Sequence, residues 1–475
     1  MDQGTSGTKA VVVAPGRGVI GSAEVALRPD FGAAGAVEQD PHALLTSVLE
    51  AGRAAVNAAG EPVAAVGLAN QGETVLVWDR STGAPLSPMV VWQDRRSADL
   101  CSRLSAHSDE LAAITGLSLD PYFAAPKMAW LREQGHAGGV VTTSDAWLIH
   151  QLCGAFVTDA STASRTLILD LDSASWSPRA LEIFGLAEEE LPEVVACAGS
   201  FGETSAFGPD LPLAGLVVDQ QAALFAQGCL QPGQAKCTYG TGAFLLANVG
   251  AGATRSHTGL PTSVAWQTRE GTSYCLDGQV YTVASAVRWL VDLGVLAGAD
   301  DLDRLGGTVA DAGEVTFVPS LAGLGAPWWA PQAKGSLTGL GLDTTGGHLV
   351  HALCEGIAAQ VADLAAAMAA DLGAPLTTLS VDGGLTRSTL LMQTQADLLQ
   401  VPVEVFASPD ATALGAAAFA HLGFDSQLAL ADAVEPWRPA ATYEPRIGAD
   451  EAAERLDRHR VAVAAVVASR GVGAG

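Results

Sequence analysis

Lysine, and charge in general, are scarce in this sequence. Only 16% of the 475 residues are charged, against about 25% in an ordinary globular protein. Four of the 25 basic residues are lysines: Lys9, Lys127, Lys236 and Lys334. Acidic residues number 51, so the formal net charge is −26. A chain this acidic repels phosphate backbones and anionic membranes, which disfavours nucleic acid and membrane surfaces as partners.

Paired cysteines, long apolar runs and a leader sequence are also missing. The seven cysteines are scattered and form no CxxC pair, which predicts reduced core cysteines of a cytoplasmic protein instead of a disulfide framework or zinc site. No run approaches the roughly 18 apolar residues of a membrane span. Residues 1–4 lack the basic and apolar regions of a signal peptide.

What is abundant is apolar material in two alternating patterns. The chain is 49% hydrophobic, enough for a large folded core. Short β-branched runs predict strands at 9–13, 63–68, 74–78, 213–218, 243–248 and 379–381. Amphipathic stretches predict helices at 97–105, 220–227, 285–293, 348–372, 389–399 and 411–421. Interleaved strands and helices predict an α/β fold.

The length predicts two large domains or three ordinary ones. The best boundary follows Gly228, a typical residue after a helix C-terminus, and precedes the turn residues 231–233. We therefore expect an N-terminal domain at 1–228 and a C-terminal domain at 229–475.

A weak internal repeat predicts two related halves: two Gly-Thr turns, one in each expected domain, open onto apolar strands. The first lies at 2–8 and the second at 238–242. Such turns can present backbone N–H groups and a hydroxyl to an anion, or they can simply connect β-hairpins. One turn per half suggests a phosphate held between two domains.

Two acidic side chains, Asp2 and Asp219, also stand at positions that suit chemistry on a phosphate. Asp2 stands beside Thr5, Ser6 and Lys9, a set that suits Mg²⁺ and phosphate oxygens, although a solvated turn at a frayed terminus would also explain it. Asp219 follows the strand at 213–218 and opens a helix. It could be an N-cap, a general base at the carboxyl end of a strand, or both.

Polar residues interrupt apolar segments at 70–74 and 90–96, as expected where the hydroxyls of a small ligand are bound. Trp92 and Tyr122 could line such a pocket or belong to the core. The double glycine at 383–384 allows close approach to a flat ring such as adenine, and Ser388 could be an N-cap only.

Together these residues resemble the FGGY carbohydrate kinases, and among them most closely the glycerol kinases. The matching stretches follow the family order over nearly the whole chain. They are DQGTSGTKA (2–10), GLANQGETVLVWD (67–79), VVWQDRR (90–96), GLSLDPYFAAPKMAWL (116–131), DAWLIHQL (145–152), TDASTASRTLILDL (158–171), the segment 213–250, LDGQVYTVASAVRWL (276–290), FVPSLAGLGAPWWAPQAKGSLTGL (317–340), VDGGLTRSTLLMQTQADLL (381–399) and ATALGAAAFA (411–420).

The resemblance implies two actin-like, ribonuclease-H-like α/β domains, with ATP bound between them and its γ-phosphoryl transferred to a primary hydroxyl of a small polyol. It implies Asp219 as catalytic base and Asp2 with Asp219 as the residues facing Mg²⁺. The implied polyol residues are Gly72, Glu73, Trp92, Tyr122, Asp219, Gln220 and Phe244. The implied ATP residues are Thr5, Ser6, Gly7, Lys9, Gly240, Thr241, Ala284, Arg288, Gly384 and Ser388.

The chain departs from the family pattern at the substrate and nucleotide positions. Gly72 stands where glycerol kinases carry an arginine that donates to substrate hydroxyls. Ala284, Arg288 and Ser388 replace a glycine, a glutamine and an asparagine on the nucleotide side. The resemblance makes glycerol the leading substrate, but the missing arginine weakens that assignment and makes a tetritol, xylulose or ribulose kinase the alternative. A weakly active ATP-binding relative and an actin-like ATPase are further alternatives.

Two further departures concern regulation and the N-terminus. Residues 201–211 lack the basic loop that binds fructose 1,6-bisphosphate in some bacterial members, so we expect no inhibition by that compound. The family has an apolar strand before the first Asp, whereas Met1 directly precedes Asp2; we expect a shortened strand, unpaired backbone groups and a loosely held Asp2. The family forms dimers and tetramers, and either state is possible here.

Overall fold

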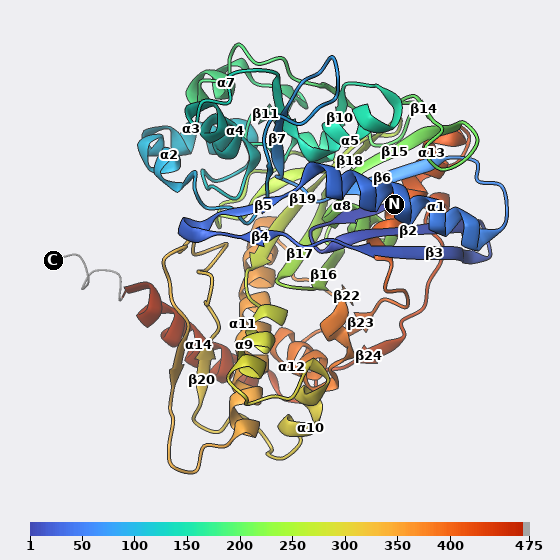
Figure 1. Cartoon of the computed structure of the whole chain (residues 1–475). Coiled ribbons are helices and arrows are strands. Elements are labelled where there is room, and N and C mark those ends of the chain that lie inside the picture. The colour runs from blue at the N-terminus through green and yellow to red at the C-terminus, as the bar shows by residue number, and fades with distance from the viewer. Residues whose placement is uncertain (469–475) are drawn as a thin grey trace.

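Two mixed sheets of similar plan, one in each half of the sequence, organise the chain (Figure 1). The computed structural model describes residues 1–468. In order across the first sheet, the strands are β14 (Glu203–Thr204), β15 (Leu211–Val218), β6 (Val66–Asn70), β1 (Asp2–Gly4), β2 (Gly7–Ala14) and β3 (Gly18–Ala26). Across the second they are β18 (Thr262–Thr268), β19 (Gly271–Val280), β17 (Ala243–Gly250), β16 (Ala235–Tyr239), β22 (Leu379–Asp382), β23 (Val403–Val405) and β24 (Ala441–Tyr443).

The two sheets repeat one pattern around the Gly-Thr turns. The first turn joins β1 to the antiparallel β2, and β1 also pairs with the parallel β6. The second turn joins β16 to the antiparallel β17, and β16 also pairs with the parallel β22. The predicted internal repeat is therefore confirmed. Both turns connect β-hairpins, as one of the two interpretations predicted. A hairpin turn can still present its N–H groups to a phosphate.

Smaller sheets complete the β-structure. A five-stranded sheet beside the first sheet contains β4 (Asp30–Phe31), β5 (Val37–Gln39), β8 (Met89–Val90), β7 (Val75–Trp78) and β9 (Val140–Thr143). Three strand pairs are β10 (Val157–Asp159) with β13 (Glu193–Val195), β11 (Leu169–Asp170) with β12 (Ser175–Trp176), and β20 (Thr316–Val318) with β21 (Ser336–Thr338).

Every predicted strand and helix is present in the structure, most of them within three residues of the expected ends. The helices of the first half are α1 (Pro41–Ala59), α2 (Ala98–Arg103), α3 (Ser108–Thr115), α4 (Ala124–Glu133), α5 (Ser144–Cys153), α6 (Ala160–Ala163), α7 (Pro178–Phe184) and α8 (Asp219–Ala226). Those of the second half are α9 (Ala284–Asp292), α10 (Leu302–Gly306), α11 (Gly346–Leu372), α12 (Thr389–Leu399), α13 (Ala411–Phe424) and α14 (Ala449–Ala468).

Helix α13, although late in the sequence, packs against the first sheet. It contacts β6 and β15, while α1 packs on β2 and β3 (Figure 1). It also crosses α8 closely, because Gly415 has no side chain: a Cβ there would lie 2.0 Å from the carbonyl oxygen of Ala222. The two halves are thus interlocked, and α8, which begins at Asp219, lies at their junction.

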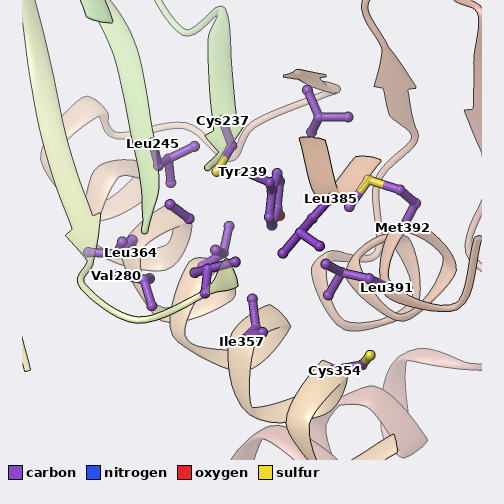
Figure 2. Packing of buried hydrophobic residues seen from close by; sticks show 14 of the residues in the cluster. Cys237, Tyr239, Leu245, Val280, Cys354, Ile357, Leu364, Leu385, Leu391 and Met392 are labelled. Atoms are coloured by element: carbon purple, nitrogen blue, oxygen red, sulfur yellow. The ribbon is translucent and has the colours of Figure 1, made fainter. Parts of the chain in front are cut away.

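The core of the second half lies between its sheet and α11. Figure 2 shows Cys237, Tyr239 and Leu245 of the sheet facing Ile357 and Leu364 of α11. Helix α11 is long and apolar enough to cross a membrane by length and composition, but 78% of its apolar window is buried inside the fold. The apolar character of α11 is therefore that of a core helix.

The first strand is short, as the sequence predicted. It consists of three residues, and Met1 continues its ladder by donating from its amino group to the carbonyl of Gly67 at 2.7 Å. Asp2 nevertheless pairs with Ala69 on β6 and with Lys9 on β2, so its backbone is held on both sides. Beyond Met1, β2 and β6 border an apolar cavity of about 590 Å³.

Candidate functional site

A cleft of about 710 Å³ lies between the two halves of the chain and collects most of the predicted polyol and phosphate residues. Its walls come from the first Gly-Thr turn, the turn after β6, the start of α8, and β17. The predicted residues that line it are Thr5, Ser6, Gly72, Glu73, Trp92, Tyr122, Asp219, Gln220, Thr241, Phe244 and Arg288. Residues far apart in the sequence thus meet in one place.

Glu73 supplies a buried carboxylate to this cleft. It follows β6 in a tight turn, with its own φ at +56°, a conformation that few residues other than glycine adopt. Only 4% of its surface is exposed. Burial raises the pKa of Glu73 to about 7, although the charges of Arg165 and Lys127 oppose the shift. The strained turn directs an acceptor for hydroxyl groups into the cleft.

Three aromatic rings form the apolar side of the cleft. Trp92 makes edge contacts with Tyr122 and Phe244, with ring centroids 5.7 and 5.9 Å apart. Tyr122 is 5% exposed, and Phe244 comes from the second half of the chain. Such rings can pack against the C–H groups of a polyol, while the carboxylates bind its hydroxyls.

Asp219 stands at the carboxyl end of β15, as predicted for a general base. It is the first residue of α8; the N-cap position belongs to Val218, so the N-cap interpretation of Asp219 was wrong by one residue. Its carboxylate accepts a hydrogen bond from the Gln220 N–H at 2.7 Å. Burial raises its pKa, and the ammonium of Lys236 opposes that rise. A carboxylate with a raised pKa is suited to accept a hydroxyl proton near neutral pH.

The hydroxyl of Thr5 is already engaged within the protein. It donates to the side-chain carbonyl of Gln71 at 3.0 Å and accepts from the indole N–H of Trp92 at 2.8 Å. Gln39 in turn donates to the Thr5 carbonyl at 2.7 Å. Thr5 therefore ties the first turn to the aromatic wall, and the exposed Ser6 is the hydroxyl in this turn that remains available to a phosphate.

Lys9 and Asp2 lie beside the cleft instead of lining it. The Lys9 ammonium forms an ion pair with Asp410 at the start of α13, so part of its charge is neutralised there. Burial raises the pKa of Asp2 to about 7, and repulsion from Asp219 adds to the rise. Gly7 begins β2 and carries no side chain to contribute.

The pair of Asp2 and Asp219 fits a divalent cation bound jointly with phosphates. The mutual repulsion that raises the pKa of Asp2 would be relieved by a cation between the two carboxylates. Residues 1–468 contain no group of three or more His, Cys, Asp or Glu side chains arranged to hold a metal alone. Mg²⁺ needs no such cage, because it commonly binds one or two carboxylates together with substrate phosphates and water.

The second Gly-Thr turn is docked onto the start of α9. The N–H groups of Ala284 and Ser285 donate to the carbonyls of Gly240 and Thr241 at 3.2 and 3.4 Å. Ala284 therefore supports the turn by its hydrogen bond to Gly240, and neither residue lines the cleft. Thr241 and Arg288 do reach it, and both are exposed.

Gly384 and Ser388, two of the predicted ATP residues, line a separate cleft of about 160 Å³ together with Asp303. The Ser388 hydroxyl caps α12, as the N-cap interpretation predicted, by accepting from the Leu391 N–H at 3.2 Å. It also donates to Asp303 at 2.6 Å. Gly384 has open space around it, as close approach of a flat ring requires.

Sequence reasoning missed three buried cations that surround the site. Lys127 donates to three consecutive backbone carbonyls, those of Pro121, Tyr122 and Phe123, at 2.5–2.9 Å. Lys236 donates to the side-chain carbonyl of Gln220 at 2.6 Å. Arg165 donates to Glu73, also at 2.6 Å. The scarcity of lysine was a signal for the first two, since three of the four lysines lie at or beside the cleft.

The geometry is that of a group-transfer site between two halves. Acceptors for hydroxyl protons, Glu73 and Asp219, share the cleft with an aromatic wall and with two turns rich in backbone N–H groups. Such turns suit phosphate oxygens, and the carboxylates with aromatic rings suit a small polyhydroxylated molecule.

Comparison with known proteins agrees with this geometry. Residues 1–226 match the N-terminal domain model of the FGGY family of carbohydrate kinases, and residues 235–423 match the C-terminal domain model. A glycerol kinase from Aromatoleum aromaticum (strain EbN1) is 41% identical over 98% of this chain and 97% of its own.

Solved structures of carbohydrate kinases have the same overall fold. The Plasmodium falciparum glycerol kinase with ADP superposes with a TM-score of 0.88 and 28% identity, covering 98% of this chain and 97% of that one. A xylulose kinase from Rhodospirillum rubrum gives 0.84 and 25%, also covering 98% and 97%. The expected two-domain fold is confirmed, and the chain belongs to the FGGY family of carbohydrate kinases.

Proposed function

We propose that the protein transfers the γ-phosphoryl group of ATP to a primary hydroxyl of glycerol and forms sn-glycerol 3-phosphate. The observation that carries the proposal is the meeting, in one cleft, of Asp219 with Glu73, the aromatic wall and both Gly-Thr turns. The similarity to glycerol kinases over nearly the whole chain supports glycerol as the polyol.

In the proposed reaction, Glu73 and Gln220 bind the hydroxyl groups of the polyol, and Trp92 and Phe244 pack against its carbon chain. Asp219 takes the proton from the attacking hydroxyl, and that oxygen then displaces ADP from the γ-phosphorus. Closure of the two halves over the bound polyol would exclude the water that competes with it as acceptor.

The phosphates would be held by the backbone of the two turns, with the Ser6 and Thr241 hydroxyls, and Arg288 beside them. Asp2 and Asp219 would hold Mg²⁺, which supplies charge neutralisation at the phosphate oxygens. Gly384 would approach the adenine. In this proposal Lys9 acts on the phosphates only by electrostatic attraction at a distance, because its ammonium is paired with Asp410.

A second candidate substrate is a larger polyol or ketose, such as a tetritol, xylulose or ribulose. Gly72 is the observation that favours it. The position is buried, lines the cleft and carries no side chain, so it leaves room where glycerol kinases have an arginine.

Several further assignments belong to the same proposal. We place the boundary between the N-terminal domain (1–228) and the C-terminal domain (229–475) at Gly228, which follows the C-cap of α8 and has a φ of +72°. We place the enzyme in the cytoplasm, supported by seven free cysteines. A homodimer or homotetramer would be in keeping with the family.

A coupled ADP-release assay over glycerol, four- and five-carbon polyols, and ketoses tests the proposal, with the product identified by mass spectrometry. We expect the highest kcat/KM with glycerol and a product of glycerol 3-phosphate. Turnover confined to larger polyols or ketoses would favour the second candidate, and ADP release without any acceptor would contradict both.

A further inference from the structure

Arg165 lies directly behind the cleft without lining it. It comes from the loop after α6, and only 3% of its surface is exposed. Its Nε donates to Oε1 of Glu73 at 2.6 Å. The other carboxylate oxygen of Glu73 makes no hydrogen bond with any described residue. The guanidinium thus binds one oxygen of the Glu73 carboxylate and leaves the second oxygen available to a ligand in the cleft.

The far side of the same guanidinium is anchored to the second half of the chain. Nη1 of Arg165 lies 2.6 Å from Oδ2 of Asp277 on β19, and both side chains are about 95% buried. Gln279 donates to the same Asp277 oxygen at 2.7 Å. Arg165 therefore spans the junction between the halves and links Glu73 on one side to a strand of the second sheet on the other.

Aromatic faces fix the plane of the guanidinium between these two anchors. It lies 5.6 Å from the ring centre of Tyr122 and 5.3 Å from that of Phe123. Nη2 also makes a long hydrogen bond of 3.4 Å to the Tyr122 hydroxyl. The planar guanidinium contacts carboxylates at two edges and aromatic rings at its faces, which fixes its orientation. The Glu73 carboxylate bound to it is therefore held in one orientation as well.

Charge adds to this geometric argument. Glu73 and Asp277 are two buried carboxylates, and Arg165 is the cation in direct contact with both. Gly72 brings no positive charge beside Glu73, so Arg165 is the guanidinium in direct contact with this carboxylate. A lysine could not replace it fully, because an ammonium has no planar fork.

We propose that Arg165 is a positioning residue for the polyol: it orients the Glu73 carboxylate and the Tyr122 hydroxyl toward the substrate, and Asp277 holds it in place from the second half. The proposal rests on the proposed function of the cleft as a polyol site. It assigns to Arg165 a role in substrate affinity and none in phosphate binding.

The test measures polyol and ATP affinity separately in the full chain. Arg165→Gln should raise the KM for the polyol, and its Kd by isothermal titration calorimetry, on the order of 10- to 100-fold, which is the range for losing a hydrogen bond to a charged group. The KM for ATP should change by less than about threefold. Arg165→Lys should recover part of the polyol affinity.

A second variant separates positioning from stability. Arg165→Gln alone leaves two buried carboxylates unpaired and can unfold the chain. Arg165→Gln with Asp277→Asn removes one charge of each sign, so we expect its Tm to recover toward wild type while the polyol Kd stays weak. If the double variant recovered both the Tm and the polyol Kd of wild type, Arg165 would serve only to balance charge, and the proposal would be overturned.

Arg132→Gln is the matched control, because it breaks a partly buried ion pair with Glu189 in the same half and away from the cleft. It should lower the Tm and leave both KM values unchanged. A folded Arg165→Gln protein that binds the polyol within about twofold of wild type overturns the proposal alone. A wild-type chain that phosphorylates no polyol overturns the proposed function, and the role of Arg165 falls with it.

Discussion

Replacing Gly72 by arginine tests how the cleft selects its polyol. Gly72 lies in the turn before Glu73, lines the cleft and has a φ that an L-residue can adopt. A Cβ at this position would lie 3.0 Å from Cγ2 of Val218, so that one methyl group must move by a few tenths of an ångström. The new guanidinium would enter a cleft that already contains the carboxylates of Glu73 and Asp219.

The expected gain can be worked from these contacts. A hydrogen bond from a charged group to a polyol hydroxyl contributes about 1.5–3 kcal/mol. Crowding Val218 costs about 1 kcal/mol, the low end for overpacking, but this cost is equal in the free and the bound enzyme and lowers only the stability of the fold. The contact of about 1.5–3 kcal/mol therefore corresponds to a decrease in the KM for glycerol of about 10- to 150-fold. Because the added contact binds substrate and transition state alike, kcat should hardly change.

The assay is coupled ADP release with glycerol and with four- and five-carbon polyols. Gly72→Ala is the control, since it imposes the same contact with Val218 without adding charge, and it should not improve the KM for glycerol. Larger polyols should bind more weakly to the arginine variant, because its side chain occupies their space. An unchanged KM for glycerol, with good wild-type turnover of a larger polyol, would refute glycerol as the substrate.

Three further predictions follow from buried groups and from surface composition. Lys127→Met removes the side-chain donor of the buried Pro121 and Tyr122 carbonyls, at about 1–3 kcal/mol each, so chemical denaturation should show a loss of at least about 2 kcal/mol; a smaller loss would contradict the role of Lys127 in holding the Tyr122 loop. Burial raises the pKa of Glu73 from 4.5 to about 7, so its contribution to stability is full below pH 4.5 and is lost as the pH rises through about 7. Glu73→Gln should flatten the dependence of Tm on pH in that window, and an unchanged slope would contradict the raised pKa of Glu73. Residues 201–211 contain no Lys or Arg, so fructose 1,6-bisphosphate should not inhibit; inhibition at physiological concentrations would count against this expectation.

The elements and their repeat were predictable because local patterns determine them. Alternating apolar runs located the strands, and glycine with threonine located both hairpin turns. The strand-to-acid pattern also located Asp219, since the carboxyl end of a parallel strand is a recurrent ligand position. Helix α13 is different: its sequence predicted a helix, but nothing local indicates that it packs on the first sheet.

Interactions between residues far apart in the sequence were not predictable in the same way. Arg165 and Asp277 are 112 positions apart, and their pairing depends on how β19 meets the loop after α6. Thr5 was predicted to bind phosphate through its hydroxyl, but Trp92 and Gln71 already engage that hydroxyl. Lys9 was predicted as a phosphate ligand, but it pairs with Asp410. In each case, tertiary packing determines which polar group remains free.

The central claim is that Asp219 is the base of a polyol kinase, and Asp219→Asn tests it most directly. Asparagine keeps the size of the side chain and an oxygen for the Gln220 N–H, but it cannot accept a proton. Single-turnover measurement of phosphoryl transfer at saturating ATP and glycerol should show a rate lower by about 10²–10⁴-fold, with the Kd for glycerol little changed. Transfer that survives within about tenfold of wild type would contradict the account.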